Sequence, residues 1–529
     1  MTDFSFAGVW HGLATVAPDR EAVVCGDRRL TFAEFDERAR RLAWHLELGG
    51  VAAGDKVAID LQNRPEYLEV FFAALKLGAV PVNVNYRYMA DEVRYVLDNA
   101  EARAVVCGPE QAAAAHEAIG GLAADRRPHV LEAGAEYEAA LAAAPADWQP
   151  SHVPSGDDLL FLYTGGTTGM PKGVMWRSDD LYVGLWQMGR PGTEPPDPIA
   201  AASAGKRVGS CLPACPLMHG TGLFIALSTL SGGGAVVLVD TAGLDASRIW
   251  DEVEHNAVAV LTIVGDVFAR PLLAALDDDP DHWDLGALQA ITSSGVTWSP
   301  ETKQGLLKHL PDVMLIDSLG ASEGMMTRAT ATAAEDIKPA RFAVSDRVRV
   351  LAEASDEQVA PGSDEIGLVA VRGRLPLGYW KDDEKTATTF RTVDGVRYSI
   401  PGDYASVDAD GTIRLLGRGS ACINTGGEKV YPEEVELLLR SHPDVHDCVV
   451  VGVPDARFGE MVVAIVQPAA DRSLTEAELG TFCRTRTAGY KRPKRFLLVD
   501  DLARGAAGKA NYRYLRQLAA ERVAAPADR

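Results

Sequence analysis

Residues 159–173 of the chain read Leu-Leu-Phe-Leu-Tyr-Thr-Gly-Gly-Thr-Thr-Gly-Met-Pro-Lys-Gly. The first five residues are an apolar run of strand length, and a loop rich in glycine and threonine follows directly. Glycines let the backbone approach a ligand closely, and consecutive N–H groups form a nest for anions. Threonine hydroxyls and Lys172 add hydrogen-bond donors and positive charge. The stretch therefore predicts a strand followed by a phosphate-binding loop, in preference to a flexible hairpin loop.

This loop differs from the two most common nucleotide-binding loops. A Walker A loop needs glycine just before its lysine and serine or threonine just after it. Pro171 and Gly173 occupy those positions around Lys172. The glycine spacing of a dinucleotide-binding fingerprint is absent as well, so another nucleotide-binding class is indicated.

On either side of this loop, short β-branched runs alternate with helical-period stretches. This alternation predicts an α/β fold with largely parallel sheets. The expected strands include residues 104–107, 235–239, 259–264 and 313–316.

The pattern changes near residue 366. We expect a strand at 366–371, a hairpin region at 394–417, and a new α/β pattern from residue 423 with a helix at 433–441 and a strand at 448–452. The short turn at residues 418–420 is the expected boundary between two domains. The predicted domains are residues 1–418 and residues 419–529.

Charge and composition exclude several classes of function. Acidic residues outnumber basic ones by 74 to 52, which gives a net charge of -22, so we expect no nucleic acid as a partner. The first residues lack the basic and apolar regions of a signal peptide, and Lys76 and Pro81 interrupt the most apolar stretch. We therefore expect a cytoplasmic protein without a transmembrane segment. Seven cysteines are too few for a disulfide framework in a chain of this length.

Cys211, Cys215 and His219 recur every four residues and raise the question of a metal site. No fourth ligand stands nearby, and Pro213 and Pro216 argue against a helix that would align the three side chains. A zinc site is therefore not expected.

The loop at residues 164–173 resembles, at every position, the signature of the adenylate-forming superfamily, Thr-Ser/Gly-Gly-Thr-Thr-Gly-x-Pro-Lys-Gly. This superfamily contains acyl-CoA synthetases, luciferases and the adenylation domains of peptide synthetases. The resemblance runs from about residue 8 to residue 515 and implies a large N-terminal domain of layered α/β subdomains with a small, mobile C-terminal α/β domain. It also implies that the ATP phosphates are held by Thr164, Gly165, Gly166, Thr167, Thr168, Gly169 and Lys172.

Further stretches of the large domain resemble superfamily motifs in the same order. Residues 216–222 resemble the segment that places a histidine, His219, beside the acyl pocket, although a lone histidine is more often structural. Residues 294–296 resemble the stretch between acyl pocket and nucleotide, which implies a role for Gly295. Residues 317–323 imply a nucleotide-binding turn of Gly320, Ala321 and Ser322, with Glu323 as ligand of Mg²⁺. Leu319 departs from the family, in which an aromatic residue commonly stacks on adenine.

The resemblance continues through the domain boundary. It implies that Asp403 binds the ribose hydroxyls, that Arg418 contacts ribose and phosphate, and that Ser420 is the hinge. Ser420 stands where the family usually has Asp or Lys, and Asn424 where many members have lysine.

In the small domain, the resemblance assigns Gly426, Gly427 and Glu428 to the tunnel for the pantetheine arm of coenzyme A, and makes Lys509 the catalytic lysine. Residues 484–495 carry six basic side chains and no acidic ones. Lys491 and Arg492 in this segment are candidates for binding the phosphates of coenzyme A, and a merely solvated basic face is the alternative.

The resemblance implies an ATP-dependent acyl-CoA synthetase that uses ATP, Mg²⁺, coenzyme A and a carboxylic acid. The run at residues 424–429 is similar to bacterial fatty-acid and steroid-side-chain CoA ligases, which favours a medium or long acyl chain or a polycyclic acid. An alternative is an adenylating enzyme that loads the thiol of a carrier protein. A more remote one is a serine hydrolase, because residues 320–324 satisfy Gly-x-Ser-x-Gly with Ser322 as nucleophile. The sequence does not identify the particular acid. It leaves the oligomeric state open, with a homo-oligomer as one possibility.

Overall fold

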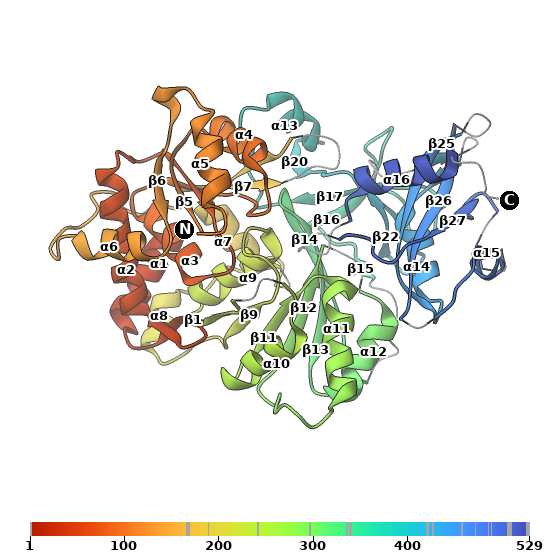
Figure 1. Ribbon diagram of the computed structural model, residues 1–529, viewed down its shortest axis with the longest axis horizontal. Coiled ribbons are helices and arrows are strands. Elements are labelled where there is room, and N and C mark those ends of the chain that lie inside the picture. The colour runs from red at the N-terminus through yellow and green to blue at the C-terminus, as the bar shows by residue number, and fades with distance from the viewer. Residues whose placement is uncertain are drawn as a thin grey trace.

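The computed structural model describes residues 3–164, 170–188, 190–240, 243–295, 298–334, 337, 341–418, 423–425, 428–455, 459–470, 472–484, 486–487, 489–504 and 510–524. It is an α/β protein with a large N-terminal domain and a smaller C-terminal domain, which is drawn in blue in Figure 1. Among the described residues, the strands form four sheets.

Two of these sheets are mainly parallel and carry the N-terminal half of the chain. The eight-stranded sheet has the order β14 (Gly324–Ala331), β13 (Met314–Ala321), β12 (Ala290–Ser294), β11 (Val260–Ile263), β9 (Cys211–Pro213), β10 (Val236–Leu238), β1 (Glu21–Cys25) and β2 (Arg28–Thr31). A seven-stranded sheet has the order β18 (Gly378–Tyr379), β8 (Lys172–Arg177), β7 (Leu159–Thr164), β4 (Val80–Asn83), β3 (Lys56–Asp60), β5 (Ala102–Cys107) and β6 (His129–Glu132). The prediction of parallel α/β layers is confirmed for this part of the chain.

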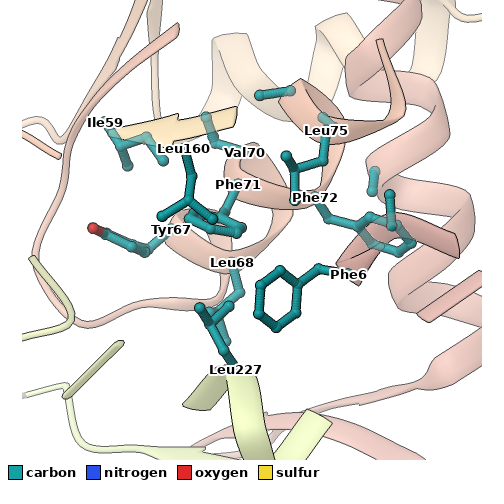
Figure 2. Close-up of a cluster of buried hydrophobic side chains, with 14 of the residues drawn as sticks. Phe6, Ile59, Tyr67, Leu68, Val70, Phe71, Phe72, Leu75, Leu160 and Leu227 are labelled. Atoms are coloured by element: carbon teal, nitrogen blue, oxygen red, sulfur yellow. The ribbon is translucent and has the colours of Figure 1, made fainter. Parts of the chain in front are cut away.

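A helical layer fills the space between these two sheets. It contains α1 (Phe6–Val16), α2 (Phe32–Leu48), α3 (Pro65–Lys76) and α9 (Gly220–Ser231), whose buried side chains join those of both sheets in one core. Every residue of α3 is buried, because this helix packs on all sides. Figure 2 shows Tyr67, Leu68, Phe71 and Phe72 of α3 among apolar side chains of neighbouring elements.

The outer faces of the two sheets are covered by other helices. Residues of α4 (Ala90–Ala100) and α5 (Ala112–Gly120) form the core on the seven-stranded sheet, and residues of α10 (Ala246–His255), α11 (Gly265–Asp278) and α12 (Pro300–His309) form the core on the eight-stranded sheet. The remaining helices of this domain are α6 (Ala135–Ala143), α7 (Ser178–Gln187), α8 (Pro198–Ser203) and α13 (Asp383–Thr389). No helix in the described part of the chain is both long and apolar enough to cross a membrane.

The third sheet is antiparallel and follows the parallel layers in sequence. It has the order β15 (Phe342–Ala343), β22 (Thr412–Arg418), β21 (Asp403–Val407), β17 (Gly367–Arg372), β20 (Val396–Ser399) and β19 (Phe390–Val393), and β16 (Val348–Ala352) pairs with β17. The predicted strand at 366–371 and the predicted hairpin region at 394–417 both lie here. The change of pattern comes earlier than expected, because β15 and β16 already belong to this sheet.

The small domain has its own sheet and helices. The sheet has the order β24 (Glu428–Val430), β23 (Ile423–Thr425), β26 (Gly459–Pro468) and β25 (Val445–Asp455), with β27 (Arg495–Leu498) on β26, and α14 (Pro432–Arg440), α15 (Glu476–Arg484) and α16 (Tyr512–Ala524) accompany it. Its two cores contain only residues from Ile423 onward. The boundary between residues 418 and 419 stays a prediction, because residues 419–422 lie outside the described part.

Candidate functional site

The predicted phosphate loop connects two neighbouring strands of the seven-stranded sheet. β7 and β8 pair in antiparallel register from Leu159 opposite Arg177 to Thr164 opposite Lys172. β7 runs parallel to β4, so Thr164 lies at the carboxyl edge, where open α/β sheets bind their ligands. The structure therefore holds the two ends of the loop, Thr164 and Lys172, side by side. The five loop residues Gly165, Gly166, Thr167, Thr168 and Gly169 lie outside the described residues.

Lys172 is held by an acidic partner that the sequence did not single out. Its ammonium group donates a hydrogen bond to the carboxylate of Asp382, which also accepts from the backbone N–H of Lys385 as the N-cap of α13. The hydrogen bond from Lys172 lowers the pKa of Asp382. Both side chains remain partly exposed, with 37% and 27% of their surface accessible. A phosphate that bound Lys172 would therefore compete with a carboxylate that solvent can reach.

Glu323 lies in the tight turn between β13 and β14. Ala321 pairs with Gly324 across this hairpin, so Ser322 and Glu323 form the turn itself. The carboxylate of Glu323 is buried and accepts a 2.7 Å hydrogen bond from Oη of Tyr379. The turn is fixed a second time by Nε1 of Trp176, which donates to the carbonyl of Ser322 at 2.8 Å.

Tyr379 connects this turn to the phosphate loop. It belongs to β18, which pairs with β8, and Nζ of Lys172 lies 6.0 Å from the centre of its ring. The cation of Lys172, the ring of Tyr379 and the buried carboxylate of Glu323 thus follow one another from β8 through β18 to the turn after β13. The structure brings Lys172 and Glu323, two of the predicted site residues, to the same region.

Gly295 and Gly320 lie on neighbouring parallel strands. Gly295 follows the last residue of β12 with φ +88, a left-handed conformation that favours glycine. Ser294 of β12 pairs with Ser318 of β13, and Gly320 and Ala321 end β13. The carboxyl ends of the two strands are therefore adjacent, which agrees with the predicted place of Gly295 between acyl pocket and nucleotide and with the predicted nucleotide contact of Gly320.

Two asparagines, the buried Asn83 and the half-buried Asn63, hold the segment that leads to His219. Nδ2 of Asn83 donates to the carbonyls of Tyr163 and Met218 at 3.0 and 2.7 Å. Asn63 donates to the carbonyls of Pro213 and Cys215 and accepts from the N–H of Leu217 at 2.7 Å. His219 itself is the N-cap residue of α9. These bonds fasten the segment to the end of β7, beside the phosphate loop.

Asp403 and Arg418 are direct cross-strand partners. Asp403 begins β21 and Arg418 ends β22, and the two residues lie opposite each other in the register of these strands. The arrangement agrees with a shared role at a ribose. For Arg418 the structure describes the backbone only.

Most of the predicted residues of the small domain lie outside the described part: Ser420, Gly426, Gly427 and Lys509. Glu428 begins β24, and its backbone alone is described. Lys491 donates to Glu434 at 2.6 Å, and Arg492 donates to the carbonyl of Thr487 at 3.0 Å.

The basic segment is less available than its sequence suggests. Arg495 is bonded to Glu476 at 3.2 Å, and the guanidinium of Arg486 lies 4.2 Å from the centre of the Phe482 ring. Lys491 is likewise paired with Glu434. Several of the basic side chains that we expected to attract the phosphates of coenzyme A therefore already have partners within the protein.

The hydrolase alternative is wrong. A nucleophile elbow needs a helix directly after its serine, whereas Ser322 is followed by the strand β14. The ring of His442, a candidate for the late histidine, packs edge-on against Phe482 in the small domain, with the ring centres 4.8 Å apart. Ser322 is a turn residue whose carbonyl is held by Trp176.

The cysteines that raised the question of zinc are buried. Cys211 lies in β9, and burial raises the pKa of Cys211 and Cys215 to about 12, so neither supplies a thiolate at neutral pH. Within the described ranges, no three His, Cys, Asp or Glu side chains gather in a group that could hold a metal ion.

The sequence assigns no role to the residues that position others. These are Tyr379, which stands in the family-like run Gly378-Tyr379-Trp380, and Asp382, Asn63, Asn83 and the buried Lys303, which bonds Asp317 of β13 at 2.5 Å. The one available signal for Asn63 and Asn83 was an amide side chain just after, or at the end of, an apolar strand. Such a residue has to find partners when it is buried.

The fold and this site define the class of protein as a two-domain, adenylate-forming enzyme. A model of the AMP-binding enzyme family matches residues 12–380, and a model of the AMP-binding enzyme C-terminal domain matches residues 434–509. The chain therefore belongs to the AMP-binding enzyme family.

Close relatives cover nearly the whole chain. It is 39% identical to the medium/long-chain-fatty-acid–CoA/3-oxocholest-4-en-26-oate–CoA ligase of Mycobacterium marinum, over 98% of this chain and 96% of the relative. It is 38% identical to the 3-oxocholest-4-en-26-oate–CoA ligase of Rhodococcus rhodochrous, over 96% and 94%.

Solved structures share the fold. The anthranilate CoA ligase AuaEII in complex with anthranoyl-AMP superposes with a TM-score of 0.85 at 23% identity, over 99% of this chain and 98% of that one. ATP-bound MatB from Rhodopseudomonas palustris gives a TM-score of 0.81 at 26% identity, over 98% and 99%.

Proposed function

We propose that this chain is an ATP-dependent, AMP-forming carboxylate–CoA ligase that acts on medium- or long-chain fatty acids or on polycyclic steroid acids. The observation that carries the proposal is the arrangement of Lys172, Tyr379 and Glu323 beside the ends of the phosphate loop. The relatives named above, which are fatty-acid and steroid-acid CoA ligases, support the substrate class. We place the reaction in the cytoplasm, and the proposal does not depend on the oligomeric state.

In the first half-reaction, an oxygen of the substrate carboxylate attacks the α-phosphorus of ATP and forms acyl-AMP, and pyrophosphate leaves. Thr164, Lys172 and the loop residues 165–169 would hold the β- and γ-phosphates. Positioning and neutralisation of charge account for most of the rate of such a step. Asp403 and Arg418 would bind the ribose, and Gly295, Gly320, Ala321 and Ser322 would line the nucleotide.

The donor set at Glu323 fits Mg²⁺. This ion prefers oxygen ligands and is bound in such sites by one or two carboxylates together with water and substrate phosphates. One oxygen of Glu323 is fixed by Tyr379, so the carboxylate keeps a defined direction and a second oxygen for a cation. The ion would neutralise the charge that develops on the leaving pyrophosphate.

In the second half-reaction, the thiol of coenzyme A attacks the acyl carbon, the bond from that carbon to the phosphate oxygen breaks, and AMP leaves.

Lys509 would stabilise charge on the phosphoryl oxygens in the first half-reaction, although it belongs to the small domain. We therefore propose that the small domain moves about Ser420, which brings Lys509 to ATP first and then opens a tunnel lined by Gly426, Gly427 and Glu428. Lys491 and Arg492 remain the candidates for the phosphates of coenzyme A, and His219 for the acyl pocket.

The test is incubation of the purified protein with ATP, Mg²⁺ and a panel of acids, with and without coenzyme A. The panel contains short, medium and long fatty acids, aryl acids, and steroid and diterpenoid acids, and mass spectrometry follows acyl-AMP and acyl-CoA. We expect acyl-CoA from the longer fatty acids or the steroid acids. Acyl-AMP without acyl-CoA would favour a carrier-protein thiol as acceptor, and neither product from any acid would contradict the proposal.

A further inference from the structure

The small domain contacts the large one through an acidic side chain that no step above uses. Glu433 is the second residue of α14, and its carboxyl group lies against the backbone of Gly417 in β22. A Cβ atom added to Gly417 would come within 2.3 Å of Cδ of Glu433, closer than any real contact. Gly417 has φ +112, a conformation that favours glycine. The absence of a side chain at residue 417 therefore creates the seat for this carboxyl group.

The seat adjoins the proposed ribose site. Gly417 pairs across the sheet with Tyr404, and the next pair is Asp403 with Arg418. The ring of Tyr404 also packs against Tyr431, the N-cap residue of α14, with the ring centres 5.6 Å apart. Glu433 and Tyr431 thus join the small domain to the two strands that carry the predicted ribose ligands.

One oxygen of the carboxyl group is buried there without a hydrogen bond. Oε2 of Glu433 is inaccessible to solvent and has no hydrogen-bond partner. An unpartnered buried polar group destabilises a fold, so its retention calls for a reason other than stability.

The same contact indicates which half-reaction this orientation of the domains serves. Tyr512, the first residue of α16, lies close enough to Glu433 and Glu436 for their charges to act on it, and its hydroxyl is 3.5 Å from Glu436. Tyr512 follows the predicted catalytic Lys509 by three residues. Tyr512 is therefore on the side of the small domain that faces Asp403, and we infer that this orientation serves the adenylation step.

We propose that Glu433 is a positioning residue: by seating its carboxyl group on Gly417 beside Asp403, it holds the two domains in the orientation that forms acyl-AMP. This inference rests on the proposed function. Formation of the thioester requires a different orientation, in which the carboxyl group leaves its seat. The contact therefore acts in one half-reaction only.

The charges around Glu433 make the contact sensitive to pH. Burial, Glu436 of the same helix and Asp403 of β21 raise the pKa of Glu433 to about 8, against the opposing effects of a backbone hydrogen bond and of Arg440 of α14. Tyr512 of α16, whose pKa is raised by burial, stays neutral. Glu433 is thus protonated at neutral pH and sits beside Asp403 without repulsion. As the pH rises through about 8, Glu433 loses its proton and its negative charge is repelled by the carboxylates of Glu436 and Asp403. The carboxyl group then leaves its position on Gly417.

A double-mutant cycle tests the contact. We expect Gly417→Ala to slow acyl-AMP formation by about tenfold, whereas acyl transfer from supplied acyl-AMP to coenzyme A changes much less. In the Glu433→Ala background, the same glycine substitution should cost little more, because the group that it displaces is gone. The matched control is Gly411→Ala: Gly411 has φ +82 in the turn between β21 and β22, and no atom lies within 4 Å of the added Cβ.

Glu433→Gln supplies the second measurement, because glutamine imitates the protonated acid. The wild-type rate of acyl-AMP formation should fall above about pH 8, and this fall should be absent in Glu433→Gln. Additive effects in the cycle, an equal loss in Gly411→Ala, or identical pH profiles would overturn the proposal.

A measurement that does not depend on catalysis distinguishes a failure of this proposal from a failure of the proposed function. Dyes on non-natural amino acids at Val153 and Tyr514, both exposed, report the distance between the domains by energy transfer. With ATP present, Gly417→Ala should shift this distance and Gly411→Ala should not. Unchanged transfer in Gly417→Ala would overturn the contact even in a protein that forms acyl-AMP. A shift in a protein that forms none would contradict the proposed function alone.

Discussion

At the scale of single residues, the hydrogen bond from Tyr379 to Glu323 links the phosphate-loop strands to the proposed magnesium ligand. Its length of 2.7 Å and its burial are typical of a charge-assisted bond, which is stronger than a neutral one. The bond limits the directions in which the Glu323 carboxylate can point. The same bond would therefore also limit the position of an ion bound by that carboxylate.

We therefore expect Tyr379→Phe to weaken the response to magnesium. The hydroxyl is lost while the ring remains, so the fold should survive. Removal of a hydrogen bond to a charged group costs about 1.5–3 kcal/mol, which corresponds to a change of about tenfold or more. The rate of acyl-AMP formation, titrated with Mg²⁺, should reach half of its maximum at a concentration higher by about this factor.

Tyr137→Phe is the matched control for this prediction. Oη of Tyr137 donates to Glu69 at 2.7 Å, and both residues are buried in the core of the large domain. This substitution should lower the melting temperature and leave the magnesium titration unchanged. If Tyr379→Phe behaves in the same way as Tyr137→Phe, Glu323 does not hold the ion.

Motif residues could be predicted from the sequence, and their partners could not. Lys172 and Glu323 stand in recognisable strings, because their chemistry demands particular neighbours along the chain. Asp382 lies 210 residues from Lys172, and Tyr379 lies 56 residues from Glu323. Those contacts depend on the pairing of β18 with β8, and no local pattern specifies that pairing. The sequence predicts a helix that begins at Glu433, but no pattern near this residue predicts its contact with Gly417.

At the scale of elements, the segment at residues 214–218 leads to His219, the proposed residue of the acyl pocket. It connects β9 to α9 and has no regular structure of its own, so side-chain hydrogen bonds must fix its path. Asn63 supplies three of them, from the loop after β3. The position of His219 at the start of α9 depends on this path.

Asn63→Ala should therefore affect the acid more than the nucleotide. Two carbonyls and one N–H lose their partner, and the segment should relax away from the phosphate loop. We expect the KM for the carboxylic acid to rise by about tenfold and the KM for ATP to change by less than about threefold.

Asn256→Ala is the control at this scale. Asn256 bonds Arg29 and Glu252 next to the C-terminal end of α10, and its loss should lower stability without a selective effect on either KM. Equal increases of both KM values in Asn63→Ala would mean that the segment supports the fold in general and not the acyl pocket.

The elements show where local pattern predicts structure and where it does not. The strand expected at 313–316 continues to Ala321, although Asp317 and Ser318 are polar. It does so because buried Lys303 pairs with the charge of Asp317 and because β14 pairs with β13 from Leu315 to Ala321. The helix expected at 433–441 is α14, one residue earlier at each end, since Pro432 is well suited to a first helical position.

At the scale of the whole molecule, the account requires two domains that change their relative orientation. The predicted catalytic lysine, Lys509, belongs to the small domain, and the phosphate loop belongs to the large one. Lys509→Ala should lower the rate of acyl-AMP formation by about 10²- to 10³-fold, the size expected for one preorganised charge donor.

Transfer from supplied acyl-AMP to coenzyme A should be much less affected in the same variant. The two half-reactions are measured separately, by release of pyrophosphate and by appearance of the thioester. An equal loss in both would count against the use of two orientations.

The central claim is that a carboxylate is activated as an acyl-adenylate before it reaches coenzyme A. The most direct measurement uses an accepted acid labelled with ¹⁸O in both carboxylate oxygens, together with ATP, Mg²⁺ and coenzyme A. One labelled oxygen bridges carbon and phosphorus in acyl-AMP and stays on phosphorus when the thiol displaces it. We expect AMP that carries one ¹⁸O, with unlabelled pyrophosphate. Unlabelled AMP, or label in inorganic phosphate formed with ADP, would contradict it.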